Sequence, residues 1–160
     1  MTGDDFVIYE QDLRALEAEL ARFLDESEAT CALLVHRSGQ VVAQRGFTRR
    51  VDTTSLAALA AGAFASTMAV AQLLGEPEFN AMFQEGQRAN IHLSTVGDRA
   101  ILVAVFDHRT TIGMVRLCAA EAGGRLDRVF SAMSARSLKA EGLLGVPTAD
   151  LFREESPRSP

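Results

Sequence analysis

The sequence predicts an α+β domain built on one central, mainly antiparallel five-stranded sheet that is flanked by helices. Two patterns carry this prediction. Apolar residues recur at helical spacing in three long segments, and five shorter apolar segments are bounded by residues that favour turns. The chain of 160 residues, 48% of them hydrophobic and 23% charged, is long enough for a single domain with its own core. The predicted order is α-β-β-α-β-β-β-α.

The first half of the chain begins with an expected amphipathic helix over residues 11–26. A compact apolar strand is expected over residues 30–36. Residues 37–40 have turn chemistry, and residues 41–44 read as the returning strand of a β-hairpin.

The second half is expected to hold a three-stranded meander and a helix. Two weaker strands are predicted over residues 81–85 and 90–96, and a central strand over residues 100–106, where the run is continuously apolar. A last helix is expected over residues 111–137. Because glycine is a poor helix former, the pair Gly123-Gly124 predicts a bend or an early end in this helix.

The character of the chain changes after residue 137, since three of the four prolines lie between Pro147 and Pro160. We therefore expect a folded domain over residues 1–137 and a flexible C-terminal tail over residues 138–160. Leu151 and Phe152 form a small apolar island in that tail. They are either a docking peptide or two incidental apolar residues.

The segment from Thr53 to Leu74 contains no charged residue and reads as one long helix, capped by Asp52 or Thr53 and stopped by Gly75. At about 100° per residue, one face is expected to cover the sheet and the opposite face to meet a second partner, because a solvated face normally carries charge. The predicted sheet-facing residues are Leu56, Leu59, Ala60, Ala63, Thr67, Val70 and Leu74. The predicted outward residues are Thr54, Ala58, Ala61, Ala65, Met68, Ala69 and Gln72.

Two other interpretations of this helix stay open. It is long enough to span a bilayer, although its Ala, Thr, Ser and Gln content argues against membrane insertion. It is also apolar enough to be buried on all sides within one domain.

The charge balance limits the class of partner. A net charge of −5 with dispersed arginines argues against nucleic acid and anionic membranes. The opening Met-Thr-Gly-Asp-Asp lacks the features of a secretory signal, so we expect a cytoplasmic protein. Cys31 and Cys118 are far apart and have apolar neighbours, which predicts two buried small side chains.

The sequence shows no nucleophile elbow, phosphate-binding glycine loop or Cys/His ligand cluster, so we predict no catalytic residue, no cofactor and no metal. His36, His92 and His108 are well separated. Asp107 and Arg109 follow the strongest strand, where they are either presented by a loop or paired in a structural turn. A hydrolase that uses His108 and Asp107 ranks far behind a regulatory function.

Two blocks of residues resemble the bacterial Roadblock (dynein light-chain) family. The first block comprises Val51-Asp52-Thr53-Thr54-Ser55-Leu56, Ala61-Gly62, Leu74-Gly75-Glu76, Phe79 and Glu85-Gly86. The second comprises Phe106-Asp107, Arg109-Thr110, Gly113 and Val115-Arg116-Leu117. The resemblance runs from about residue 6 to residue 117, and the likeness is greatest to family members of gliding-motility systems.

The resemblance implies a homodimer in which the long helices pair around a two-fold axis and the two sheets join. It also implies a partner, a small Ras-like GTPase (MglA-like), seated on the paired helices. Family members are thought to reshape the switch regions of the GTPase without inserting an arginine finger, which fits a helix without cations. We therefore expect a GTPase-activating regulator in bacterial motility or cell polarity. The alternative is a passive Roadblock scaffold dimer that does not stimulate hydrolysis.

Under this interpretation the outward face of the long helix forms a docking strip for the GTPase. Its predicted members are Thr54, Ala58, Ala61, Ala65 and Met68, with Arg116 as a rim contact. By resemblance, Leu151 and Phe152 are a second contact.

Overall fold

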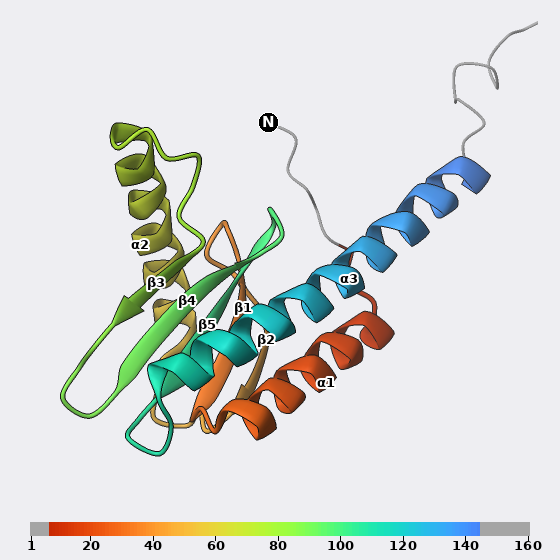
Figure 1. Ribbon diagram of the computed structural model, residues 1–160. Coiled ribbons are helices and arrows are strands. Elements are labelled where there is room, and N and C mark those ends of the chain that lie inside the picture. The colour runs from red at the N-terminus through yellow and green to blue at the C-terminus, as the bar shows by residue number, and fades with distance from the viewer. Residues whose placement is uncertain (1–6, 145–160) are drawn as a thin grey trace, which may run out of the picture.

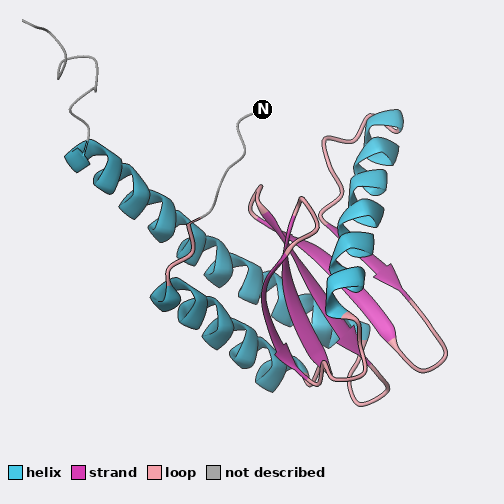
Figure 2. Cartoon of the chain, turned by 180° about the vertical axis from the view of Figure 1, so that it is seen from behind, coloured by secondary structure: helices cyan, strands magenta, loops and turns pink. Residues whose placement is uncertain are grey.

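The computed structural model describes residues 7–144 and has three layers. A five-stranded sheet has one long helix on one face and two helices side by side on the other (Figures 1 and 2). The elements in chain order are α1 (Glu10–Ser27), β1 (Cys31–His36), β2 (Val41–Gly46), α2 (Thr53–Leu73), β3 (Ala81–Gln84), β4 (Asn90–Val96), β5 (Ala100–Phe106) and α3 (Ile112–Leu144). The predicted order of helices and strands is confirmed.

The sheet is antiparallel throughout and has the strand order β2-β1-β5-β4-β3. As its apolar sequence predicts, β5 lies at the centre, with β1 and β4 on either side. Positive φ angles at Gly39 and Gly97 close the two tight turns β1–β2 and β4–β5, a conformation that glycine adopts at no steric cost.

The two faces of the sheet build two separate cores, because successive side chains of a strand point to opposite sides. In β1, Leu34 packs into the cluster with α1 and α3, whereas Leu33 packs into the cluster with α2. Cys31 lies in the α2 cluster and Cys118 in the other. Both thiols are buried, as predicted, and burial raises the pKa of each one.

Helix α3 does not bend or end at its glycines, so that prediction is wrong. It runs unbroken through Gly123 and Gly124, past the predicted end near residue 137, and is described as far as Leu144. Its packing against α1 explains why, since Leu126, Phe130 and Met133 are all buried beyond the glycines. The expected boundary between domain and tail therefore falls inside a helix. The remainder of the expected tail, with Leu151 and Phe152, lies outside the described residues.

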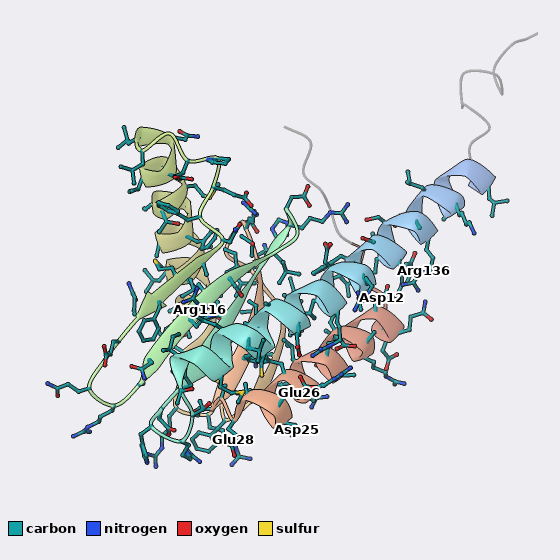
Figure 3. All side chains as sticks on the ribbon, in the orientation of Figure 1. Asp12, Asp25, Glu26, Glu28, Arg116 and Arg136 are labelled. Carbon is teal, nitrogen blue, oxygen red and sulfur yellow. The ribbon has the colours of Figure 1, made fainter. Side chains whose placement is uncertain are left out.

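Ion pairs fasten α3 to α1 along the same seam. The Arg125 guanidinium donates to the Glu19 carboxylate at 2.6 Å, and Arg136 donates to Asp12 farther along α3. Figure 3 shows the Asp12 and Arg136 side chains meeting between the two helices. Asp12 is 3% exposed and also accepts from the backbone N–H of Tyr9, so one buried carboxylate both caps α1 and holds α3.

Helix α2 begins at the cap that the sequence predicts. The Asp52 carboxylate accepts from the Ser55 backbone N–H at 3.1 Å and from the Ser55 hydroxyl at 2.6 Å, which selects Asp52 over Thr53 as the N-cap. At the other end, Gly75 follows the helix with a φ of +72°, so it stops α2 as expected.

We predict that Asp52→Ala lowers the Tm of the protein at neutral pH and that this difference shrinks in acid. Hydrogen bonds from the Ser55 hydroxyl and the Ser55 backbone N–H lower the pKa of the Asp52 carboxyl in the folded chain. Its stabilising effect is therefore complete above the unfolded-state pKa of about 4 and is lost as the pH falls through the lower folded-state pKa. Thermal unfolding followed by circular dichroism at both pH values measures this. A Tm difference that stays constant below about pH 3 would contradict it.

Candidate functional site: the exposed face of α2

The buried face of helix α2 overlaps the predicted face only in part. Ala60 is buried and Leu56 packs against the core cluster of this layer, as predicted. Ala57, Ala60, Ala61, Phe64 and Ala71 are buried. Leu59 and Val70, which were expected to cover the sheet, are 72% and 46% exposed. The predicted face followed from helical spacing at about 100° per residue. The structure instead brings small alanines against the strands and fills the remaining space with Phe64.

Ala61 shows why the small residues face inward. It was expected on the outward face but is 6% exposed. The β1–β2 turn approaches α2 at this point. A Cβ built on Gly39 would lie 3.2 Å from the Ala58 Cα and 3.8 Å from the Ala61 Cβ. A larger side chain at position 61 would push the turn away, so this alanine serves close packing of the hairpin.

The face of α2 that points away from the sheet is exposed and carries no charge. We name it the exposed α2 face and define it by Thr54, Ala58, Leu59, Gly62, Ala65, Ser66, Ala69, Val70 and Leu73. Leu73 is 86% exposed, and the last turns of α2 rise past the ends of the strands in both views (Figures 1 and 2). The interpretation that this helix is buried on all sides is therefore wrong for the single chain. An exposed apolar surface of this kind indicates an interaction site.

The predicted docking residues fall into three groups. Thr54, Ala58 and Ala65 lie on the exposed α2 face, as expected. Met68 is half-buried against the α2 core cluster, and Ala61 is buried. Sequence reasoning missed Leu59, Val70 and Leu73 as surface residues, although the absence of charge around the whole helix was a signal for an apolar face at any rotation.

Arg116 does not lie beside this face. It belongs to α3, which covers the opposite side of the sheet, and Figure 3 shows it on the flank of α3 towards β3 and β4. Within one chain Arg116 therefore does not adjoin the α2 docking strip, and its contact with a partner stays a prediction. The chain position of Arg116, just after the β5–α3 loop, gave no indication of which side of the sheet the helix would take.

The edge strand β3 adds to the apolar surface of the molecule. It pairs with β4 and stands last in the strand order, so its outer backbone groups face away from the sheet. Phe83 is 40% exposed, and its ring stacks on that of Phe106 with centroids 6.0 Å apart. An edge strand with exposed apolar residues is a template for pairing with a second chain.

Gly62 lies on the exposed α2 face, and a substitution there tests whether the fold of the single chain requires glycine at this position. A Cβ at Gly62 or at Gly75 would meet no atom within 4 Å, but only Gly75 has a positive φ, +72°. We predict that Gly62→Ala raises the free energy of unfolding by about 1 kcal/mol, because alanine favours the helix. Gly75→Ala, the matched control, is expected to lower it. Denaturant unfolding of dilute protein measures both, and a destabilised Gly62→Ala chain would contradict the argument.

The residues with potential acid–base chemistry are scattered. His36 ends β1, His92 is buried in β4 and His108 lies in the β5–α3 loop. The Asp107 carboxylate accepts from the Arg109 guanidinium at 3.0 Å and from the Arg109 backbone N–H, and these bonds lower the pKa of Asp107. Asp107 and Arg109 therefore form a structural turn pair. No group of three or more His, Cys, Asp or Glu side chains placed to hold a metal occurs within residues 7–144.

Helix α2 also meets the length and hydropathy criteria for a membrane span, as its sequence indicates. This is weak support for insertion, because the core helix of a soluble protein passes the same test. In this fold its inner face packs on the sheet, through Phe64 and the buried alanines.

Known proteins share this architecture. The Roadblock/LC7 domain matches residues 16–106, which span α1 to β5. The structure is similar to Myxococcus xanthus MglB, with 37% sequence identity, a TM-score of 0.74 and coverage of 79% of this chain and 96% of that chain.

Two further solved structures are similar. The gliding protein MglB from Thermus thermophilus has 33% identity and a TM-score of 0.73, covering 78% of this chain and 95% of its own. A structure described as MglB with tetrameric arrangement has 31% identity and a TM-score of 0.76, covering 81% and 97%. No curated protein sequence matches the chain. By its matched domain and by its likeness to these structures, the chain belongs to the Roadblock/LC7 family.

Proposed function

We propose that this protein is a GTPase-activating regulator of a small Ras-like GTPase (MglA-like) and that it acts as a homodimer. Family membership and the likeness to MglB structures support a regulatory role. The description of one such structure as tetrameric supports assembly through Roadblock surfaces. Cytoplasmic location and a role in cell polarity or gliding motility are parts of the same proposal.

The observation that carries the proposal is the exposed α2 face. It is a helix surface without charge from Thr53 to Leu73, with Leu59, Val70 and Leu73 open to solvent. Such a surface is costly to leave in water, and its burial against a second copy and a GTPase would offset that cost. The side chains Ala58, Ala65 and Ala69 are small enough for another backbone to approach α2 closely.

The proposed mechanism is a shift in the conformational population of the GTPase. A helix without Arg or Lys has no cation to insert among the phosphates, so it cannot act as an arginine finger. A surface that binds the hydrolysis-competent switch conformation more tightly raises the occupancy of that conformation. The residues of the GTPase then carry out the chemistry. Leu151 and Phe152 are proposed as a second contact with the same partner.

A turnover assay separates the two candidate functions. GTP hydrolysis by a purified MglA-like GTPase is measured alone and with an excess of this protein. A faster rate supports the activator, whereas stable binding without a change in rate would support the passive scaffold. If the two proteins neither bind nor affect hydrolysis, the proposal of a GTPase partner is wrong.

We predict that Leu59→Glu weakens self-association by about tenfold or more, because a carboxylate would be buried without a partner in the α2 interface. The parent chain of 17.2 kDa is expected to sediment as a dimer at micromolar concentration. Leu117→Glu is the matched control, since Leu117 is 59% exposed on α3, on the other side of the sheet. A parent chain that sediments as a monomer, or an unchanged Leu59→Glu dimer, would exclude α2 as the dimer interface.

A further inference from the structure

A second site lies on the opposite side of the sheet from α2, between α3 and strands β3 and β4. It is a pocket of about 350 Å³ lined by residues of these elements, among them His92, Ser94, Arg116, Gly123 and Gly124. This volume is at the lower end of the range that small-molecule sites occupy. No motif in the sequence links these residues to one another.

Two polar side chains at this pocket have no hydrogen-bond partner within the described chain. They are His92, through Nδ1, and Ser94, through Oγ. His92 is 3% exposed, so its ring is removed from water while a polar atom stays unpaired. Buried polar groups are almost always satisfied, and an exception needs an explanation. A bound ligand, met by small rotations of the Ser94 hydroxyl and the His92 ring, would supply one.

The same pocket carries a positive charge, that of Arg116. Arg116 lines the pocket, and none of the ion pairs among residues 7–144 involves it. Burial lowers the pKa of the His92 imidazole, and the charge of Arg116 lowers it further. An arginine beside unpaired imidazole and hydroxyl groups is a donor set suited to carboxylate or phosphate oxygens.

The two glycines of α3 provide the space. Glycine disfavours a helix, so a pair in the middle of α3 needs a reason. A Cβ at Gly124 would meet nothing within 4 Å, and a Cβ at Gly123 would make only an ordinary contact with the Thr95 carbonyl at 3.6 Å. The packing of this chain therefore requires glycine at neither position, whereas added methyl groups at these lining positions would reduce the pocket.

From this arrangement we propose that the pocket between α3 and β4 binds a small metabolite through its carboxylate or phosphate group. Arg116 supplies the charge, and Ser94 and His92 supply the directed hydrogen bonds. Because α2 covers the other face of the sheet, this site is separate from the exposed α2 face. Its occupancy does not require the proposed GTPase partner, so the two proposals fail independently.

The test is a titration of the full chain followed by NMR of the His92 side chain. The probes are inorganic phosphate and succinate, which distinguish the two oxyanions, and sodium chloride at equal ionic strength is the control. A saturable shift with phosphate or with succinate, and none with chloride, supports the site. A shift that is equal with chloride, or that does not saturate, overturns it, because it would report screening alone.

Variants locate the binding. Arg116→Gln is expected to weaken binding by about tenfold or more, since a charged hydrogen bond is lost. Arg128→Gln, which removes an exposed arginine elsewhere on α3, is expected to leave binding unchanged. Gly124→Ala is expected to weaken binding without lowering the Tm, which separates a filled pocket from a damaged fold. Equal affinities in all three variants would show that the ion binds elsewhere and overturn the assignment.

Discussion

A chain that carries Ala65→Arg is expected to fold like the parent and to lose its stimulation of GTP hydrolysis, leaving the GTPase near its unstimulated rate. Ala65 is exposed at the middle of the exposed α2 face, so the longer side chain has room in the single chain. In the complex, the same side chain would hold the two backbones apart and place a charge in an apolar contact. The expected loss is about tenfold or more in the stimulated rate.

The measurement is GTP turnover at saturating regulator, together with circular dichroism to show that the helices are retained. Ala18→Arg is the matched control, because Ala18 is an exposed alanine of α1 on the other side of the molecule. It should stimulate hydrolysis as the parent does. If Ala65→Arg stimulates equally, the exposed α2 face does not contact the GTPase and the proposed binding surface must be abandoned.

Phe64→Ala is expected to lower the free energy of unfolding by about 3 to 5 kcal/mol, the usual cost of removing a buried aromatic ring. Phe64 is 2% exposed and belongs to the core cluster between α2 and the sheet. Its neighbours across that layer include Leu33 and Val103. The buried partners on α2 itself are alanines, which cannot expand into the cavity.

Chemical denaturation monitored by circular dichroism measures the change. Phe47→Ala is the control, since Phe47 is 56% exposed and its removal is expected to change stability by no more than about 0.5 kcal/mol. Similar losses in the two variants would mean that α2 is not held to the sheet by Phe64. Ala61→Arg should be at least as damaging as Phe64→Ala, because it forces a charge into the same layer.

The elements of this fold could be predicted because their periodicity is local. The run from Ala100 to Phe106 is apolar at every position, and the structure places it at the centre of the sheet. Local periodicity could not predict the rotation of α2 about its own axis, that is, which of its faces packs on the sheet. An apolar helix without charges has no polar stripe to orient it. Its contacts with the hairpin turn at Gly39 and with the sheet through Phe64 join residues far apart in the sequence.

The end of α3 was misplaced for a related reason. Two glycines suggested a break in the helix. Ion pairs and buried contacts with α1, which is far away in the sequence but packs beside α3, stabilise the continuous helix. The pocket at His92 and Arg116 also escaped the sequence, because strand β4 and helix α3 meet only in three dimensions. Of the predicted docking strip, the sequence correctly placed Thr54, Ala58 and Ala65 on the exposed side of α2. Met68, which is half-buried, and Ala61, which is buried, were misplaced.

The two faces of the sheet have separate cores, so substitutions in one core are expected to affect the other only weakly. A substitution at Leu34 and one at Leu33 disturb different clusters, although the residues are adjacent in the chain. Changes on the α2 side can accumulate during divergence with little repacking of α1 and α3, since additivity holds for residues that share no partners. The sheet thus separates two sets of packing contacts, so that a substitution in the α2 layer is expected to leave the packing of α1 on α3 unchanged.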